Sequence, residues 1–276
     1  MNKSIPEEIV LRYSRRGMDT LKNHLDKYYC RKAAEKIINT KRGNVLLTTG
    51  FYVEGYAETD GPLGTVAVAL ALNKLGFHSI IVTDLYCKGF FEIKGIDVEY
   101  VDIDSNRDVY DEILKKYQPV YLISIERCGK NSEYEYANMH GISITKNTAP
   151  IDFLFELAGK QQIPTIGVGD GGNEIGMGNL QKIIKNELKI DPCIISVDDL
   201  VIGTTSNWGA YALVSYLEYL TGKKVMTNFE EMKDYLCDIL KIGCVDGVKK
   251  KKVMGVDGFD MLIEKEILDD LERAIV

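Results

Sequence analysis

The sequence predicts an α/β fold, built on a doubly wound, mostly parallel sheet with helices on both faces. Short apolar runs typical of buried strands alternate with longer segments of helical periodicity along most of the chain. This alternation indicates βαβ units with right-handed crossovers, which place helices on both faces of one sheet. The chain of 276 residues has no evident linker, so we expect a single domain over residues 1–276.

The composition excludes several classes of function. A net charge of −7 disfavours general nucleic-acid binding, which needs clustered positive charge. No apolar run approaches the length of a membrane-spanning helix, and the first residues lack the apolar core of a signal peptide. We therefore expect a cytoplasmic protein without membrane contact. The six cysteines form no C-x-x-C pair, and three histidines are too few for a His-rich metal site.

The chain begins with a segment of helical character. Apolar residues recur at helical spacing between residues 5 and 39, which predicts a helical N-terminal extension over residues 1–43. The α/β core is expected to follow over residues 44–276. Within the extension, Arg15 and Arg16 are interpreted as part of a solvated helix face in preference to a ligand-binding patch.

The first strand is expected at residues 44–48 (NVLLT), and a long polar connection follows it. A connection of this length between a strand and a helix usually has a function. Three acids gather in it, at Glu54, Glu58 and Asp60, before Pro62 begins the next helix.

The same alternation continues to the C-terminus and predicts a sheet of about five to seven strands. Further strands are expected at residues 79–83, 98–103, 121–125 and 165–169, two short apolar pieces at 194–197 and 200–202, and helices at 88–93, 109–116, 151–159, 180–188, 229–242 and 261–274. Asp84 and Asp102 follow two of these strands. We interpret them as helix caps in preference to ribose-binding acids.

Two adjacent charged residues, Glu126 and Arg127, stand where the strand at 121–125 meets a second long polar loop. They are consistent with an internal ion pair, and equally with an acid and a bidentate donor presented to a substrate carboxylate. Both alternatives stay open at this stage. His140 in the same loop is interpreted as incidental to the chemistry.

The stretch PTIGVGDGGNEIGMG, residues 164–178, carries the strongest signal of a site. An apolar strand stops at Asp170, and two glycines that tolerate positive φ follow it. Three polar side chains lie within five positions here: Asp170, Asn173 and Glu174. A helix beginning near residues 175–176 would direct its free N–H groups toward the same place.

Two further motifs are candidates for the same site. Thr205 and Asn207 in GTTSNWG precede an apolar helix, where they suit either N-capping or the binding of an anion. A duplicated V-D-G sequence places Asp246 and Asp257 in turns on either side of four lysines, which we interpret as a solvated hairpin tip. Ligands collect at the carboxyl edge of parallel sheets. We therefore expect one pocket to receive the loops at residues 52–61, 126–140, 170–176 and 204–208.

Several of these stretches resemble, in order, the C-terminal domain of the D-glutamate cyclase family. They are TTGFYVEGYAETDGPLGT, SIERCGKNSEYEYANMHG, PIDFLFELA, TIGVGDGGNEIGMG, TTSNWGAYAL and VDGV…VDG. The resemblance spans roughly residues 44–260, and GDGGNEIGMG is its most specific part. It implies a lyase (a hydro-lyase) that converts D-glutamate to 5-oxo-D-proline and water. The resemblance also implies that larger family members carry an additional N-terminal domain, in whose place we expect the helical extension here.

The implied reaction determines which residues are candidates for catalysis. The amine of glutamate must attack the side-chain carboxyl carbon while a hydroxide equivalent leaves, so the site must move protons and neutralise a carboxylate. We assign Asp60, Asp170 and Glu174 to this task. Whether they act as acid and base or hold a divalent metal, Mg²⁺ or Mn²⁺, stays open. No other cofactor is expected.

Substrate binding is assigned to residues beside these acids. Arg127 fits the α-carboxylate of an amino acid, with Glu126 adjacent to it, and Asn173, Thr205 and Asn207 fit carboxylate oxygens. The implied partner is a small amino acid, and association into a homo-oligomer is left open. Two other functions stay open, a phosphate- or nucleotide-binding α/β enzyme and a non-catalytic amino-acid-binding module.

Overall fold

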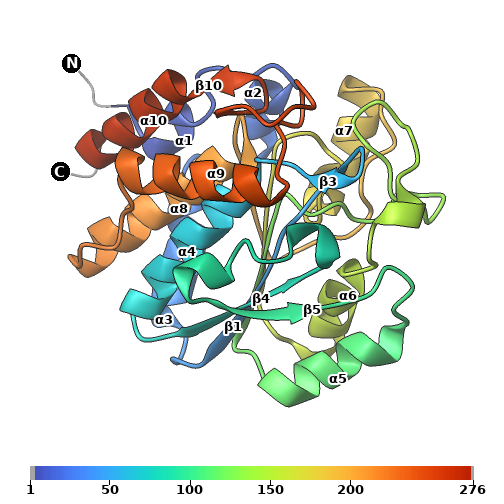
Figure 1. Cartoon of the computed structure of the whole chain (residues 1–276). Helices are drawn as coiled ribbons and strands as arrows, with labels where there is room; N and C mark the ends of the chain where they lie inside the picture. The colour runs from blue at the N-terminus through green and yellow to red at the C-terminus, as the bar shows by residue number, and fades with distance from the viewer. Residues whose placement is uncertain (1–3, 275–276) are drawn as a thin grey trace.

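The computed structural model describes residues 4–274, and a six-stranded sheet forms its centre (Figure 1). All strands run parallel, in the order β5-β4-β1-β6-β7-β8. The strands are β1 (Asn44–Thr48), β4 (His78–Thr83), β5 (Asp97–Tyr100), β6 (Tyr121–Ile125), β7 (Thr165–Gly169) and β8 (Asp199–Ile202). The fold class expected from the sequence, a mostly parallel α/β sheet, is confirmed.

The central strands are buried on both faces, as their continuous apolar runs require. Every residue of β6 and β7 is buried, whereas β5 at the edge is only partly covered. The expected bounds of β1, β6 and β7 are correct. The strand expected at 98–103 ends earlier, at Tyr100, and residues 194–197 form no strand.

The order of the strands creates a switch point between β1 and β6. From β1 the chain moves outward to β4 and β5, then returns to the other side of β1 and continues outward through β6, β7 and β8. Connections leaving β1 and β6 therefore diverge, which opens a crevice at the carboxyl edge of the sheet. This topology places the polar loops after β1, β6 and β7 around one point.

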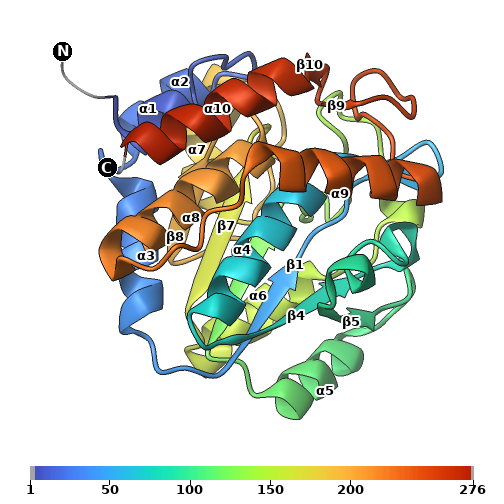
Figure 2. The same cartoon turned by 60° about the vertical axis from the view of Figure 1, so that its left-hand side comes forward.

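Helices cover both faces of the sheet (Figures 1 and 2). On one face lie α3 (Tyr29–Asn39), α4 (Pro62–Lys74) and α8 (Ser206–Thr221); on the other lie α5 (Arg107–Tyr117) and α6 (Asp152–Gln161), and α7 (Gln181–Glu187) links β7 to β8. Packed outside α4 and α8 are α9 (Phe229–Ile242) and α10 (Met261–Ala274). Because it lies between the sheet and this outer layer, α4 is buried along most of its length.

The N-terminal segment is not the continuous helical run expected over residues 5–39. It is divided into α1 (Pro6–Ile9), α2 (Met18–Leu21), η1 (Lys22–His24) and α3. The break before α2 is stabilised at Gly17, which has a φ of +79°. A Cβ at this position would lie 2.3 Å from Cδ2 of Leu188. Glycine therefore permits both the turn and the close packing.

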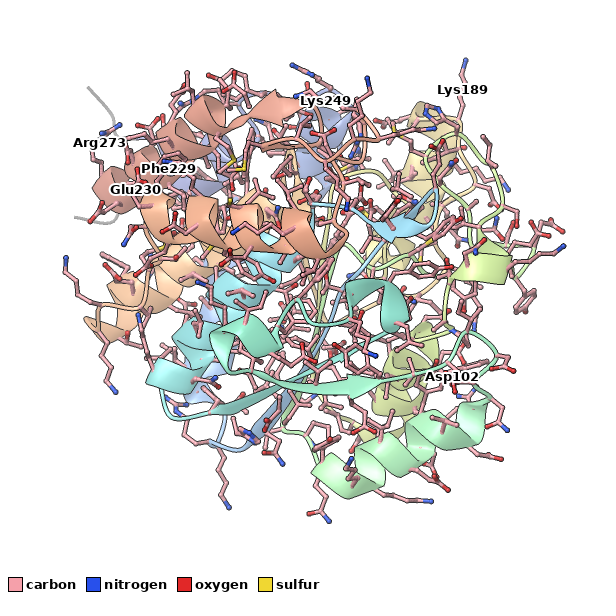
Figure 3. The ribbon with its side chains drawn as sticks, viewed as in Figure 1. Asp102, Lys189, Phe229, Glu230, Lys249 and Arg273 are labelled. Atoms are coloured by element: carbon pink, nitrogen blue, oxygen red, sulfur yellow. The ribbon has the colours of Figure 1, made fainter. Side chains whose placement is uncertain are left out.

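Short elements complete the fold. They are the hairpins β2 (Tyr52–Val53)–β3 (Tyr56–Ala57) and β9 (Gly255–Val256)–β10 (Phe259–Asp260), and the 3₁₀ turns η2 (Leu85–Cys87), η3 (Glu92–Lys94), η4 (Thr145–Asn147) and η5 (Met177–Leu180). Two of these turns, η2 and η3, replace the helix expected at 88–93. Lys249, the first residue of the four-lysine run, points outward from the surface, in agreement with the expected solvated tip (Figure 3). Among the described helices, none is both long enough and apolar enough to cross a bilayer.

Replacing Gly17 with alanine should test the break in the N-terminal segment. We expect Gly17→Ala to lower the free energy of unfolding by about 1–3 kcal/mol, because alanine strains the positive φ and contacts Leu188. Chemical denaturation measures the change. Gly159→Ala in α6 is the control, since a Cβ there meets no atom within 4 Å. A neutral Gly17→Ala would contradict this account of the turn.

Candidate active site

A cavity of about 620 Å³ lies beyond the carboxyl ends of β6 and β7. The four loops that the sequence predicts to converge all contribute to its wall, with Glu58, Glu126, Asp170 and Thr204 taken from one loop each. The N-terminal segment adds residues 15–16, and the loop around β9 and β10 closes the remaining side. The expected convergence on one pocket is confirmed.

Glu126 occupies the residue directly after β6 and is 4% exposed. Its backbone has a φ of +50°, a conformation that non-glycine residues rarely adopt. Its Oε2 accepts a hydrogen bond of 2.5 Å from Oγ of Ser206. An unfavourable backbone conformation at a cavity wall is typical of residues held in place for function.

Asp170 is the corresponding residue after β7, and it is fully buried. Its Oδ2 accepts a hydrogen bond of 2.7 Å from Nη1 of Arg16, which also contacts Asp257 at 2.7 Å. Burial raises the pKa of Asp170 well above its ordinary value, Arg16 opposes the rise, and Asp257 adds to it by repulsion. One arginine therefore neutralises part of the charge on two buried acids.

Asp60, in the loop before α4, packs against the N-terminus of α8 and accepts hydrogen bonds of 2.8 Å from the backbone N–H groups of Ser206 and Asn207. These donors and the positive end of the helix stabilise its ionised form. Burial, followed by the charge of Asp257, acts in the opposite direction and raises the pKa of Asp60 to about 8. Asp60 is thus close to changing its protonation state near neutral pH.

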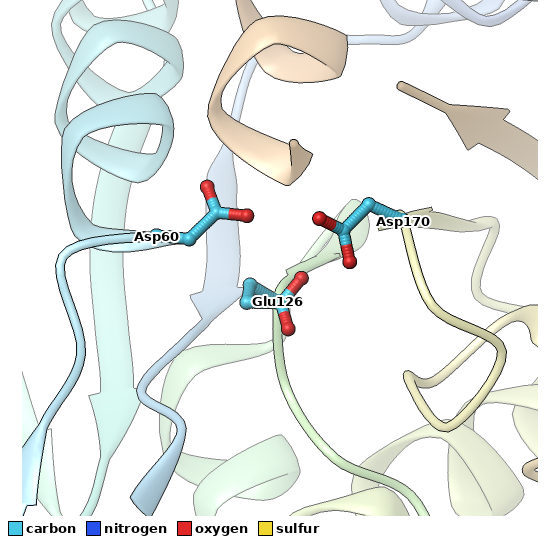
Figure 4. A group of neighbouring side chains, drawn as sticks. All are labelled: Asp60, Glu126 and Asp170. Carbon is cyan, nitrogen blue, oxygen red and sulfur yellow. The ribbon is translucent and has the colours of Figure 1, made fainter. Parts of the chain in front are cut away.

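These three carboxylates form one cluster (Figure 4). Asp60, Glu126 and Asp170 each offer an oxygen that lies within 4.8 Å of those of the other two. Burial, followed by repulsion from Asp170, raises the pKa of Glu126 well above its usual range. The arrangement suits either shared protons or a bound cation.

Further acids surround the cluster. Glu58 and Asp257 line the cavity and are each 6% exposed. Burial raises the pKa of Glu58, and repulsion from Asp257 and then from Asp60 adds to the rise. The carboxylate of Glu58 lies directly against the backbone of Gly247, where a Cβ would be 1.8 Å from its Oε2. The first V-D-G turn thus leaves room for an acid.

Glu174 and Asn173 also line the cavity, but they mainly shape the glycine turn. The two carboxylate oxygens of Glu174 accept the N–H groups of Gly171 and Gly172, both at 2.8 Å. Asn173 donates from Nδ2 to the carbonyl oxygen of Ala137 at 2.9 Å.

A helix does begin close to the expected position near residues 175–176, as the 3₁₀ turn η5 with Gly176 as its N-cap. Its N–H groups are not free for a ligand, because those of Gly176 and Gly178 both bond to the carbonyl oxygen of Ile195.

Arg127 faces away from the cavity. Its guanidinium donates to the carbonyl oxygens of Gly50 and Ala149 and pairs with Asp84 at 2.7 Å, with 1% of the side chain exposed. It therefore forms an internal ion pair, with Asp84 and not with Glu126. The expected contact of Arg127 with a substrate carboxylate has no support in this geometry.

The two strand-end aspartates differ from each other. Asp84 also accepts the N–H of Tyr86, as expected of a cap. Asp102 is exposed at the periphery of the sheet (Figure 3).

Three other expected residues are buried around the site without lining it. Thr205 caps α8 by accepting the N–H of Trp208. Asn207 accepts the N–H groups of Gly61 and Gly64, so it joins α8 to the start of α4. Asp246 accepts N–H groups within its own loop, and Asp257 is the member of the V-D-G pair that reaches the cavity.

Sequence reasoning missed Glu58, Arg15 and Arg16 as site residues. Arg16 is not on a solvated helix face: its side chain is 20% exposed and its pKa is raised, because Asp170 and Asp257 outweigh the opposing effect of burial. Arg15 lines the cavity, stacks over the ring of Phe259 at 4.2 Å, and has no ion pair in the part of the chain that the structure describes. The glycine after these arginines was the available signal of a break.

A second hollow of about 600 Å³ lies beside α5 and α6. Its cations Arg107 and Lys130 both pair with Glu156, at 2.7 and 2.5 Å. It contains none of the site residues expected from the sequence. We therefore place the candidate active site in the cavity beyond β6 and β7.

Removing the positive charge of Arg16 should lower the stability of the protein by an amount that depends on pH. We expect Arg16→Gln to lower the free energy of unfolding by about 2 kcal/mol or more at pH 8, because it leaves Asp170 and Asp257 without a partner. At pH 5 the loss should be smaller, since these acids can take up protons. Denaturation at both values measures it. The exposed Arg15→Gln is the control, with a cost of about 1 kcal/mol or less; equal costs for both variants would contradict the assigned role of Arg16.

The raised pKa of Asp60 predicts how stability depends on pH. The unfolded chain ionises this group near its ordinary value of 3.8, whereas the folded protein holds the proton up to about pH 8. Stability from this group is therefore lost as pH rises from about 4 to about 8. In metal-free buffer, Asp60→Asn should reduce the loss between pH 5 and 8 by at least about 1 kcal/mol. An unchanged slope of unfolding free energy against pH would refute the assignment.

Comparison with known proteins identifies one family. The family model for the D-glutamate cyclase-like, C-terminal domain matches residues 7–272, which include most of the N-terminal segment. Human mitochondrial D-glutamate cyclase is 32% identical over 212 residues. The aligned region covers 67% of this chain and 34% of the human protein, so the chain corresponds to only part of that relative.

Solved structures show only distant likeness. An exopolyphosphatase-related protein from Bacteroides fragilis has a TM-score of 0.40 and 10% identity, covering 91% of this chain and 62% of that one. UDP-glucose 4-epimerase from Brucella ovis has a TM-score of 0.32 and 15% identity, covering 54% and 49%. Both scores are too low to support an argument. The family match carries the assignment: the chain belongs to the D-glutamate cyclase-like family and corresponds to its C-terminal domain.

Proposed function

We propose that this cavity catalyses the cyclisation of D-glutamate to 5-oxo-D-proline and water. The observation that carries the proposal is the group of buried carboxyl groups whose pKa values are raised, among them Glu58 at the cavity wall. Groups of this kind can both take up and release protons during a reaction. Family membership supports the same chemistry. The cavity volume of about 620 Å³ is ample for an amino acid.

The reaction is a transfer of protons from nitrogen to oxygen. The substrate enters with an ammonium group and an ionised side-chain carboxylate. Forming the new C–N bond requires the nitrogen to lose two protons, and breaking the C–O bond as water requires the oxygen to gain two. No proton is consumed overall, so a group that accepts protons at nitrogen and returns them at oxygen is sufficient.

Glu58 is the proton carrier that we propose. It lines the cavity, it is buried, and its pKa is raised by burial and by repulsion from Asp257 and Asp60. A protonated Glu58 can donate to the leaving oxygen, and the resulting carboxylate can accept a proton from the amine. The backbone of Gly247 against its carboxylate limits where the group can move.

The charges around the cavity suggest how the substrate is oriented. The excess of carboxylates at the wall attracts the ammonium group toward Glu58 and Asp257. Arg15 lies on the cavity wall without an acidic partner among the described residues, so we assign the substrate α-carboxylate to it in place of Arg127. Arg16 is less available, because Asp170 and Asp257 already occupy its guanidinium.

The three residues assigned to catalysis from the sequence take different parts in this proposal. Asp170 lines the cavity and can contact the substrate. Asp60 lies behind the wall, with its carboxylate held by α8. Glu174 has both oxygens bound to glycine amides, which makes it a positioning residue for the turn that carries Asp170.

The cavity gives less support to the alternative functions. A phosphate- or nucleotide-binding site would need free N–H groups and positive charge, whereas Glu174 occupies the amides of the glycine turn and acids dominate the wall. A non-catalytic amino-acid-binding module remains a testable alternative. The human relative is named as mitochondrial, so the cytoplasmic location of this chain remains a prediction, as do its amino-acid partner and its association into oligomers.

Formation of 5-oxoproline by the purified chain tests the proposal directly. We expect turnover of D-glutamate by the wild type and a decrease of about two orders of magnitude or more for Glu58→Gln and for Asp170→Asn, the usual effect of losing a general acid or base. The exposed Glu112→Gln on α5 is the matched control and should retain activity.

Calorimetry separates the remaining readings. Binding of D-glutamate without turnover by the wild type would favour the amino-acid-binding module. Failure to bind or convert either enantiomer of glutamate would sink the proposed function of this chain. Retention of full activity by Glu58→Gln would move the proton carrier to another carboxyl group.

A further inference from the structure

We propose that Asp60, Glu126 and Asp170 bind one divalent cation at the floor of the cavity. The ligand set differs from the one expected from the sequence, because Glu126 replaces Glu174. The catalytic meaning of the cation rests on the proposed function, whereas its binding can be measured independently of that function.

The three ligands converge from separate parts of the fold. Glu126 and Asp170 follow the neighbouring strands β6 and β7, and Asp60 approaches from the loop before α4. One oxygen from each lies within 4.8 Å of the other two. Ligand oxygens around a six-coordinate Mg²⁺ ion, each about 2.1 Å from the metal, lie within about this distance of one another. The backbone therefore gathers the carboxylates closely enough to share one ion.

Each carboxylate is oriented by a donor on its outer side. Arg16 donates to Oδ2 of Asp170, and the hydroxyl of Ser206 donates to Oε2 of Glu126. The amides at the start of α8 hold Asp60. Orientation of ligands by such outer contacts is characteristic of metal sites.

A buried atom without a partner points to the missing ligand. The side chain of Asp170 is fully buried, yet its Oδ1 accepts no hydrogen bond within residues 4–274. Buried polar atoms are nearly always paired, so an orphaned carboxylate oxygen needs an explanation. The carboxylate of Asp170 faces Asp60 and Glu126 (Figure 4). A cation between the three groups would satisfy this oxygen.

The charge balance supports the same conclusion. Among the described residues, Arg16 is the only cation that pairs with the buried acids around the cavity, and it contacts Asp170 and Asp257. Glu58, Asp60, Glu126 and Glu174 have no cationic partner there. A divalent cation would offset two of these charges. The ligands are carboxylate oxygens, with no histidine or cysteine in the cluster, so a hard ion of the Mg²⁺ or Mn²⁺ class fits best.

Glu174 is excluded from the ligand set by its existing contacts. Its two oxygens accept the amides of Gly171 and Gly172. Turning the carboxylate toward the cluster would leave these buried N–H groups unpaired. In the proposed reaction, a cation at the cluster would act as a Lewis acid on the side-chain carboxylate of the substrate. Without a cation, an ionised carboxylate is a poor electrophile.

Electron paramagnetic resonance of Mn²⁺ tests the site in the full chain. The protein is freed of metal with EDTA, exchanged into buffer and titrated with MnCl₂, and the signal of free Mn²⁺ reports binding. We expect one saturable site for the wild type, with displacement by Mg²⁺. Asp170→Asn and Glu126→Gln should each weaken the affinity by about tenfold or more, because each removes an anionic ligand.

Glu54→Gln is the matched control, since Glu54 is an exposed acid at the rim that pairs with Lys250 at 2.7 Å. Its affinity for Mn²⁺ should equal that of the wild type. Circular dichroism verifies folding, and Glu126→Gln gives the same test if Asp170→Asn does not fold, because glutamine still accepts the hydrogen bond from Ser206. Absence of saturable binding by the wild type, or equal affinity in all variants, overturns the proposal.

The titration contains no glutamate, so its result does not depend on turnover. Binding of Mn²⁺ at the cluster without formation of 5-oxoproline would contradict the proposed function and leave the cation site supported. Turnover of D-glutamate in the presence of EDTA, combined with no Mn²⁺ binding, would contradict the cation site alone.

Discussion

Repulsion between buried carboxylates is the constraint on which the rest of this site depends. Asp60, Glu126 and Asp170 bring oxygens within 4.8 Å of one another. At that separation two unit negative charges repel by roughly 3.5 kcal/mol in a medium with an effective dielectric constant of about 20. Because a folded domain is stable by only about 5–15 kcal/mol, three ionised groups would offset much of its stability. The fold must therefore provide protons or positive charge to this cluster.

The surrounding elements provide this compensation in three physical forms. The N-terminus of α8 directs backbone N–H groups at Asp60, and Arg16 contributes a formal charge to Asp170. Burial and mutual repulsion raise the pKa values of the remaining groups, including that of Glu58. The same electrostatic conditions that cost stability thus favour protonated carboxyl groups, which the proposed cyclisation can use.

The N-terminal segment is therefore connected to the candidate active site. Arg16 precedes the positive-φ turn at Gly17 and reaches Asp170, a residue 154 positions later. The family match beginning at residue 7 includes this turn. The segment can consequently be understood as part of the wall of the cavity, where it supplies both the buried partner of the acids and, through Arg15, an exposed cation.

The sequence by itself determined the parallel α/β fold, most strands and helices, and the convergence of the acidic loops, because apolar periodicity and turn residues are local signals. For the same reason it placed Asp60 and Asp170 in loops beyond strands. Only the tertiary structure decided the partners of the charged residues. Arg127 and Arg16 each stand next to another charged residue in the sequence, yet Arg127 pairs with Asp84 inside the fold and Arg16 pairs with Asp170 at the cavity. Such pairing depends on contacts between segments far apart in the chain, which local patterns do not encode.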